Sequence, residues 1–295
     1  MNKVHFIVNP IAGRGDATFN KASLSGYFEP EQYELTIKTS NYPGHATLLA
    51  KESLAEGAGI IVACGGDGTI NEVASCLVHT KVLLGIIPMG SGNGLAESLD
   101  ISRNIKRAVE IIKSGKTNRI DVAMVNGKPF FSNMGIGFDA TVISNYNASQ
   151  HRRFWAYLKA VIKSIRDFKY NEKINVEMNG KSFKTRPFMF FISNSKVMGY
   201  DISLTRMASL QDGLLDVVII DDLSKFQMLF MGLFILLRLD QYLKKIQYYK
   251  VKHLKLAFED KQKEHLMQAD GELHNLMDRE IFVNVEEKAL HVLCP

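Results

Sequence analysis

The sequence predicts an α/β domain followed by a domain of antiparallel β-strands. Strands and helices alternate over the first third of the 295-residue chain, and glycine-rich loops follow several of those strands. Short strands joined by hairpin turns fill most of the remainder. The change of texture predicts a first domain over 1–118 and a second over 119–286. The tail, 287–295, is compatible with a return to the first domain.

The first domain is expected to hold a mainly parallel sheet covered by helices on both faces. Its strands are predicted at Val4–Val8, Tyr33–Lys38, Gly59–Cys64 and Val82–Ile87. Its helices are predicted at Thr18–Phe28, at His45–Glu56, after a cap at Thr69, and at Arg103–Ser114. Ligands of such sheets bind beyond the carboxyl ends of the strands.

The second domain is expected to be an antiparallel β-sandwich, because turn signals such as Asn126-Gly127 and Asn179-Gly180 separate its apolar runs. Strands are predicted at Arg119–Val125, Lys128–Ser132, Lys173–Met178, Lys181–Thr185, Phe188–Ser193, Leu214–Ile220, Val251–Phe258, His265–Ala269 and Glu280–Glu286. Two helical segments interrupt them, at His151–Lys169 and Ser224–Lys245.

Composition limits the classes of function. The formal charge of +5 and the pI of about 8.9 suit a nucleotide or an anionic membrane surface but fall short of a nucleic-acid-binding protein. Three scattered cysteines form no disulfide framework, which favours a reducing cytoplasm. No apolar run is long enough for a signal peptide or a bilayer span. A soluble cytoplasmic protein is therefore expected, and contact with the inner face of the membrane is compatible with it.

The loop Gly65-Gly66-Asp67-Gly68-Thr69 is the most informative motif, because it joins a buried strand to a helix. Glycines allow the backbone to approach a ligand, and the N–H groups at a helix start favour an anion. A carboxylate there suits a phosphate only if a divalent cation lies between them. The loop therefore predicts a nucleotide phosphate and metal site, against the alternative of a tight turn without a ligand.

Two further loops follow strands of the same sheet and predict a nucleotide cleft at its edge. One begins at Asn9-Pro10 and continues to Gly15, with Arg14 placed near the phosphates. The other is Gly90-Ser91-Gly92-Asn93, in which Ser91 and Asn93 offer polar contacts. The segment Gly135–Ala140 matches G-x-G-x-x-A, but it lies among antiparallel strands and is not expected to open a helix of a βαβ unit.

Four motifs in order resemble the diacylglycerol kinase and sphingosine kinase superfamily, which includes bacterial lipid kinases. They are Asn9-Pro10-x-Ala12-Gly13-x-Gly15, Gly65-Gly66-Asp67-Gly68-Thr69-x-Asn71-Glu72, Pro88-x-Gly90-Ser91-Gly92-Asn93 and Asp270-Gly271-Glu272. The resemblance implies a Rossmann-type nucleotide-binding domain like that of phosphofructokinase and NAD kinase, then a β-sandwich, with ATP and a lipid substrate meeting between them.

The resemblance also implies roles for particular residues. Glu272 is the implied general base, with Asp270 beside it and Asp67 organising Mg²⁺ and phosphate. A structural Mg²⁺ is implied on a loop with the Asp212 side chain and the backbone carbonyls of Ser209 and Leu214 as ligands. ATP contacts are implied for Asn9, Pro10, Ile11, Ala12, Gly13, Ser40, Gly66, Asp67, Gly68, Thr69, Ile70, Asn71, Glu72 and Ser91.

Several readings stay open at the level of the sequence. Asp270-Gly271-Glu272 is either a catalytic turn or an ordinary one, and Asp139 either lies near a lipid head group or is a turn residue. The basic, amphipathic segment His151–Lys169 either lies on an anionic membrane or packs on its own domain. Gly94 after Asn93 resembles the sphingosine and ceramide kinase version, which leaves diacylglycerol, phosphatidylglycerol and sphingoid acceptors open. An NAD kinase-like enzyme and a catalytically silent nucleotide-binding protein are the alternatives, and a homodimer is compatible with the sequence.

Overall fold

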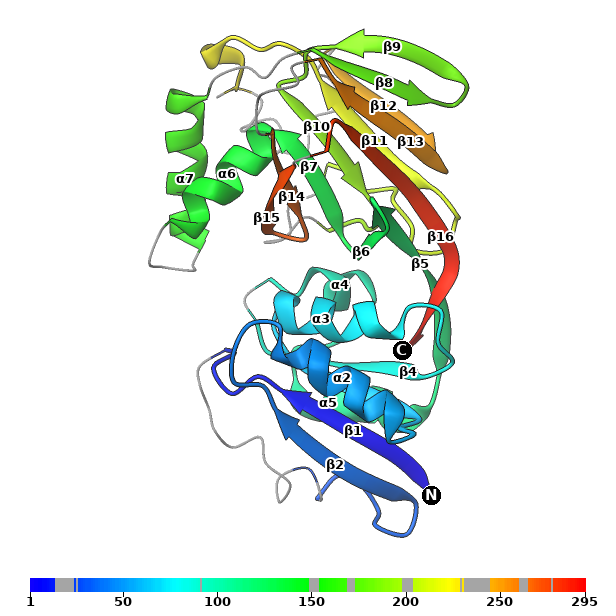
Figure 1. Cartoon of the computed structure of the whole chain (residues 1–295). Helices are drawn as coiled ribbons and strands as arrows, with labels where there is room; N and C mark the ends of the chain where they lie inside the picture. Colours follow the sequence, from blue (N-terminus) through cyan, green and yellow to red (C-terminus); the bar gives the residue numbers. More distant parts are fainter. Residues whose placement is uncertain are drawn as a thin grey trace. The chain divides into compact units, whose positions relative to one another are not determined.

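The computed structural model describes residues 1–13, 24, 26–90, 92–148, 154–168, 173–197, 204–228, 230, 245–259, 265–276 and 278–295 (Figure 1). The chain divides into two compact units. Unit 1 comprises Met1–Val122 with Glu287–Pro295, and unit 2 comprises Ala123–Glu286. The predicted boundary lies after residue 118, four residues before the point at which the units part.

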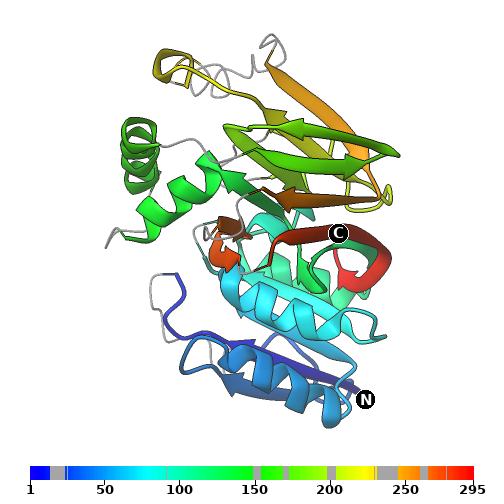
Figure 2. The same ribbon diagram turned by 45° about the horizontal axis from the view of Figure 1, so that its top comes forward.

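Unit 1 is built on a parallel sheet in the order β2-β1-β3-β4, formed by Asn2–Val8 (β1), Tyr33–Thr39 (β2), Ile60–Gly65 (β3) and Leu83–Pro88 (β4). Strands β1, β3 and β4 are apolar and largely buried, as expected where helices cover a sheet, whereas β2 at the edge is more exposed. Helices α2 (His45–Ala55) and α3 (Asp67–Leu77) pack together, and α5 (Ile105–Ser114) packs on β4 (Figure 1, Figure 2). The predicted α/β fold is confirmed.

The tail does lie in unit 1. Val292, near the end of the long strand β16 (Glu280–Leu293), pairs in parallel with Leu84 of β4. The Ala289 carbonyl accepts the N–H of His79, and the Asp121 carboxylate accepts the N–H of Lys288. These contacts join the last residues of the chain to the sheet that carries the glycine-rich loops.

The helices of unit 1 differ from the prediction in two places. Helix α3 begins two residues before Thr69, with Gly66 as its N-cap and no side-chain cap, so Thr69 lies inside the first turn. A short helix, α4 (Gly94–Ser98), follows the loop after β4 and was not expected. Most of the predicted helix Thr18–Phe28 lies outside the described residues.

Unit 2 is a β-sandwich, as predicted. One antiparallel sheet has the order β12-β11-β10-β7-β14-β15, from Ile246–Val251 (β12), Leu215–Ile220 (β11), Met189–Ser193 (β10), Asn133–Gly137 (β7), His265–Ala269 (β14) and Glu272–Leu276 (β15). The other has the order β16-β13-β8-β9, with His253–Phe258 (β13), Ile174–Met178 (β8) and Lys181–Thr185 (β9). Thr117–Val125 (β5) pairs with β16 and with Lys128–Phe130 (β6). Buried side chains from both sheets form one apolar cluster.

A second apolar cluster lies where two helices, α6 (Phe138–Asn147) and α7 (Phe154–Asp167), meet the six-stranded sheet. Helix α7 agrees with the prediction over the described residues. Helix α6 was missed: Gly137, at φ 90°, is its N-cap, so the segment Gly135–Ala140 does open a helix, although its strand is antiparallel. Strand β12 was also missed. The predicted helix Ser224–Lys245 is helical at 225–228 and 230, and most of the rest lies outside the described residues. Within the described part of the chain, no helix combines the length and apolar character needed to cross a membrane.

Candidate active site

In unit 1, the start of α3 faces the loop that precedes α4. The N–H groups in the first turn of an α-helix have no partner within the helix, and Gly66 provides no side chain to cap them. The Asp67 carboxylate instead caps the neighbouring helix: its two oxygens accept the N–H of Asn93 at 2.8 Å and of Gly94 at 2.6 Å. One carboxylate thus fixes the spacing between two glycine-rich loops.

The glycines of these two loops are needed because their backbones touch. A Cβ atom on Gly90 would come within 2.6 Å of the Gly66 Cα atom, and one on Gly92 within 2.6 Å of an Asp67 carboxylate oxygen. Asn93, in the left-handed region at φ 59°, closes its loop by accepting the Gly90 N–H and donating to the Gly90 carbonyl. Any side chain at Gly66 or Gly90 would therefore separate the loops.

The first predicted loop also reaches this region. The Asn9 side-chain amide donates to the Thr69 hydroxyl at 3.2 Å, and its oxygen accepts the N–H of Ile11. Asn9 itself is held to β3 by its N–H, which donates to the Cys64 carbonyl. The structure therefore brings Asn9 and Thr69 together, and Ile11 is 85% exposed beside them.

Other predicted nucleotide contacts have partners within the fold. The Glu72 carboxylate accepts the N–H groups of Gly44 and Thr47 at the start of α2, which is a capping contact. The Ser40 hydroxyl is buried and donates to the Val8 carbonyl. Ser91 and Arg14 lie outside the described residues. Pro10, Ala12 and Gly13 lie in the described loop after β1, while Gly68, Ile70 and Asn71 belong to α3.

The donor set at the start of α3 fits a phosphate, because uncapped N–H groups converge there and the helix dipole favours negative charge. The Asp67 oxygens each retain further lone pairs beyond the N–H that they accept, so they also fit Mg²⁺. Within the described residues, no group of three His, Cys, Asp or Glu side chains forms a metal cage. Any Mg²⁺ here would therefore need phosphate or water oxygens to complete its coordination.

In unit 2, the turn between β14 and β15 carries Asp270, Gly271 and Glu272. The Asp270 carboxylate accepts three backbone N–H groups, from Phe131 at 2.7 Å, Ser132 at 2.7 Å and Asn133 at 3.1 Å. Asp270 and Gly271 both have positive φ angles, of 49° and 82°. The hydrogen bonds of Asp270, the first residue of the turn, therefore hold the turn in place. Glu272 follows the turn as the exposed first residue of β15.

Gln268 is a residue of this turn network that sequence reasoning missed. Its side-chain N–H₂ group donates to the Asn133 oxygen at 2.9 Å and to the Asp139 carboxylate at 2.6 Å, while its oxygen accepts the Gly271 N–H at 2.9 Å. The amide is buried, and both its N–H₂ group and its oxygen form hydrogen bonds. An amide side chain in a mainly apolar strand, two positions before Asp270, is the signal that could have found it.

Asp139 lies in the first turn of helix α6, so it is not a residue of a loop turn, which was one of the two alternatives. It is buried, and loss of hydration raises its pKa to about 6, while the hydrogen bond from Gln268 acts in the opposite direction. A Cβ atom at position 135 would collide with its carboxylate, so Gly135 makes room for it. A lipid contact of Asp139 stays a prediction.

A cation from β12, the Lys250 ammonium, contacts the predicted structural metal loop, residues 209–216. The Asp212 carboxylate accepts the Leu214 N–H at 3.2 Å and pairs with the Lys250 ammonium at 2.7 Å. The same ammonium lies 3.4 Å from Asp216, whose pKa is raised by burial despite Lys250. The Ser209 hydroxyl accepts the N–H of Gln211. Asp212 therefore fits a metal only if Lys250 moves aside.

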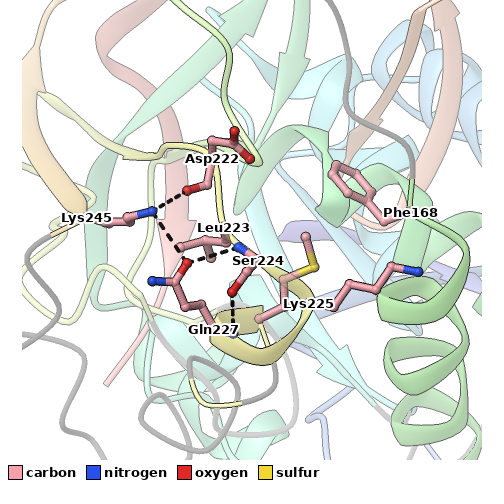
Figure 3. A pocket seen from close by; sticks show the side chains of 8 residues that line it. Phe168, Asp222, Leu223, Ser224, Lys225, Gln227 and Lys245 are labelled. Carbon is pink, nitrogen blue, oxygen red and sulfur yellow. Dashed lines mark hydrogen bonds between the residues drawn. The ribbon is translucent and has the colours of Figure 1, made fainter.

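Unit 2 also has a pocket of about 490 Å³, separate from the predicted site residues (Figure 3). The Lys245 ammonium lies beside it and donates to the Asp222 carbonyl at 2.7 Å, and Lys225 projects toward the helix that ends near Phe168. Its lining comprises Phe168, Asp222, Leu223, Ser224, Lys225, Gln227, Met228 and Lys245.

Comparisons with known proteins identify the family to which both units are similar. Residues 3–125 match the diacylglycerol kinase catalytic domain, and residues 132–294 match the YegS C-terminal NAD kinase beta sandwich-like domain. A Bacillus subtilis (strain 168) protein, diacylglycerol kinase, is 30% identical over 225 residues, which cover 75% of this chain and 74% of the relative. A Staphylococcus aureus (strain bovine RF122 / ET3-1) diacylglycerol kinase is 26% identical over 223 residues, covering 74% and 70%.

Solved structures share the fold. One Bacillus anthracis str. Sterne structure superposes with a TM-score of 0.80 at 24% identity, over 100% of this chain and 97% of that one. A second, of a diacylglycerol kinase from the same strain, has a TM-score of 0.73 at 19% identity, with coverage of 100% and 97%. At this level of identity the structures establish the architecture alone.

Proposed function

This chain belongs to the diacylglycerol kinase family and is a lipid kinase, and we propose that it transfers the γ-phosphoryl group of ATP to a lipid hydroxyl group with the help of Mg²⁺. The observation that carries the proposal is the pair of glycine-rich loops that Asp67 holds together at the start of α3. In this proposal unit 1 binds the nucleotide, and unit 2 provides Glu272 and the lipid-binding residues.

The proposed phosphate site uses backbone groups. The N–H groups of Gly66, Asp67, Gly68 and Thr69 lie at the start of α3, where a helix favours an anion. Asn9 adds an amide that is already oriented by Thr69. Bound Mg²⁺ would supply charge neutralisation of the phosphates, and Asp67 is the proposed residue to orient it. Ser209, Asp212 and Leu214 are proposed as a separate structural Mg²⁺ site.

The proposed general base is Glu272. It accepts the proton of the lipid hydroxyl as the hydroxyl oxygen attacks the γ-phosphorus. The bond between the γ-phosphorus and the β,γ-bridging oxygen breaks, and ADP leaves with that oxygen. Its exposure leaves the carboxylate open to substrate, and the hydrogen bonds of Asp270 and Gln268 hold the backbone before it. Asp270 thus acts in this proposal through the position of Glu272.

Diacylglycerol is the proposed first candidate for the acceptor, because the curated relatives are diacylglycerol kinases. The test is a panel of acceptors with labelled ATP. Diacylglycerol, phosphatidylglycerol, a sphingoid base and, as the alternative acceptor, NAD are each offered to the wild-type protein. Labelled phosphatidic acid is the expected product, and labelled NADP without labelled lipid would contradict the proposal.

Two variants assign the roles of the carboxylates. Glu272→Gln is expected to lower turnover by about 1,000-fold while ATP affinity, measured by calorimetry, stays within about twofold. Asp67→Ala is expected to lose both activity and Mg²⁺-dependent ATP affinity, because the loops separate and the metal loses its carboxylate. Near-wild-type turnover of Glu272→Gln would exclude Glu272 as the base.

A further inference from the structure

We propose that Arg103, which lies between α4 and α5, is a positioning residue of the candidate nucleotide site. It acts through one peptide group, the one that joins Gly92 to Asn93. The Arg103 guanidinium donates to the Gly92 carbonyl at 3.0 Å. The N–H of the same peptide group donates to the Asp67 carboxylate at 2.8 Å. A cation therefore holds one end of this peptide group, and an anion holds the other.

The residues on either side of this peptide group do not determine its orientation by themselves. Gly92 has no side chain, so the peptide group that follows it can rotate with little steric hindrance. Asn93 has a φ angle of 59°, a left-handed conformation that few residues other than glycine adopt. Rotation by half a turn would point the Gly92 carbonyl oxygen at the Asp67 carboxylate, where two acceptors repel each other. Arg103 stabilises the orientation in which the N–H faces Asp67.

The two hydrogen bonds strengthen each other. Both are charge-assisted, and such hydrogen bonds are stronger than those between neutral groups. The guanidinium polarises the peptide group toward its carbonyl oxygen, which makes the N–H a better donor to Asp67. The next N–H along the chain, that of Gly94, donates to the second Asp67 oxygen at 2.6 Å. Arg103 thus helps to fix the direction in which the Asp67 carboxylate presents its remaining lone pairs.

The contact between the loop and Asp67 is close where Arg103 binds. A Cβ atom on Gly92 would lie 2.6 Å from an Asp67 carboxylate oxygen. Arg103 also lies 3.9 Å from the Glu97 carboxylate of α4, the helix that begins at Gly94. Because 59% of the Arg103 side chain is exposed, its removal is expected to affect this loop more than the stability of the whole fold.

The link from Arg103 to the nucleotide rests on the proposed function, in which Asp67 orients Mg²⁺. A metal ion competes with the two N–H groups for the same carboxylate oxygens. By holding the peptide group between Gly92 and Asn93, Arg103 keeps those N–H groups in place when the metal binds. The quantity that depends on Arg103 is therefore the Mg²⁺-dependent part of the nucleotide affinity.

Hydrogen exchange of the full chain without nucleotide tests the contact itself. Arg103→Ala is expected to speed the exchange of the N–H groups of Asn93 and Gly94 by about threefold or more, measured by mass spectrometry of peptides that cover them. The matched control, Arg107→Ala, removes the same charge from an exposed position of α5 and should leave this exchange unchanged. The measurement does not depend on the proposed function, because no ligand is present.

Calorimetry with ADP tests the effect on the site. Arg103→Ala is expected to weaken ADP binding in the presence of Mg²⁺ by about 3- to 10-fold, and to change it by no more than about twofold in EDTA. Arg103→Lys keeps the charge and one donor, so it should recover part of the loss. In an Asp67→Ala background, Arg103→Ala should have no further effect beyond about twofold, because the group through which it acts is gone.

The outcomes separate this inference from the kinase assignment. An undiminished effect of Arg103→Ala in the Asp67→Ala background would overturn the inference and assign Arg103 to direct phosphate contact. Unchanged amide exchange in Arg103→Ala, or the same acceleration in Arg107→Ala, would also overturn it. Faster exchange in Arg103→Ala of a protein that binds no nucleotide would instead sink the proposed function and leave the role of Arg103 in the loop standing.

Discussion

At the scale of single residues, Asp139 shows how the site departs from what stability alone favours. Its carboxylate is buried beside Gln268, and burial raises its pKa from 3.8 to about 6. Because the raised pKa means that folding favours the protonated form, the stabilising contribution is complete below 3.8 and is lost as the pH rises through about 6. At neutral pH the ionised group therefore destabilises the fold.

Asp139→Asn is accordingly expected to stabilise the protein at pH 7.5, by up to about 3 kcal/mol, since each pKa unit corresponds to about 1.4 kcal/mol. The gain should vanish near pH 4, where Asp139 is protonated in both states. Urea unfolding of both proteins at the two pH values measures it. A variant that is less stable than wild type at pH 7.5 would show that the carboxylate has a stabilising charge partner.

At the scale of elements, the β14–β15 turn is held by two sets of hydrogen bonds. Asp270 binds the backbone of 131–133, and Gln268 connects Asp139 of α6 to the N–H of Gly271. The carboxylate of Asp139 attracts the N–H₂ side of the amide, which leaves the amide oxygen for Gly271. The turn that precedes Glu272 is therefore oriented from a neighbouring helix.

Gln268→Met, which keeps the volume and removes the amide, is expected to lower kcat by about 10- to 100-fold, with the KM for ATP within about twofold, since small displacements of a base have effects of that size. In Gln268→Glu, a protonated carboxyl group can replace the amide, donating to Asp139 and accepting from Gly271. Its kcat relative to wild type should therefore rise as the pH falls from 8 to 6. The ratio for Gln268→Met should stay flat over that range. The same pH dependence in both variants would indicate a packing role only.

The loop 209–216 provides the second prediction at this scale. Mg²⁺ at Asp212 must displace the Lys250 ammonium, which lies 2.7 Å from the carboxylate. Lys250→Met is therefore expected to raise the affinity of the full chain for Mg²⁺ by about tenfold, because it removes a competing positive charge. Calorimetric titration with MgCl₂ measures this, and Lys184→Met, which breaks an exposed ion pair with Glu259, is the control. Weaker Mg²⁺ binding by Lys250→Met would argue against Asp212 as the ligand.

At the scale of the whole molecule, patterns spread along the chain were easier to predict than single contacts. The parallel sheet, the sandwich and helices α5 and α7 follow from apolar patterns that extend over many residues. Helix α6 was missed because the segment Gly135–Ala140 lies among antiparallel strands, where no helix was expected; Gly137 nevertheless turns the chain into a helix, and Gly135 makes room for Asp139. Helix α4 is too short to show a period.

The candidate site was likewise predictable in its loops but not in its long-range contacts. Its loops could be predicted from glycine spacing, because two backbone segments can approach this closely only where glycines stand. The partners of its carboxylates could not, since Asp67 joins Asn93, and Asp270 joins Phe131, over long sequence separations. Those contacts depend on how strands and loops meet, which no local pattern records.

The central claim is that the start of α3 binds the phosphates of ATP, and a crystal structure of the full chain with Mg²⁺ and a non-hydrolysable ATP analogue tests it most directly. The account predicts phosphate oxygens within hydrogen-bond distance of the N–H groups of Gly66–Thr69, with Asp67 oriented toward the metal. A triphosphate bound elsewhere, with the two glycine-rich loops still closed on each other and no phosphate at α3, would contradict it.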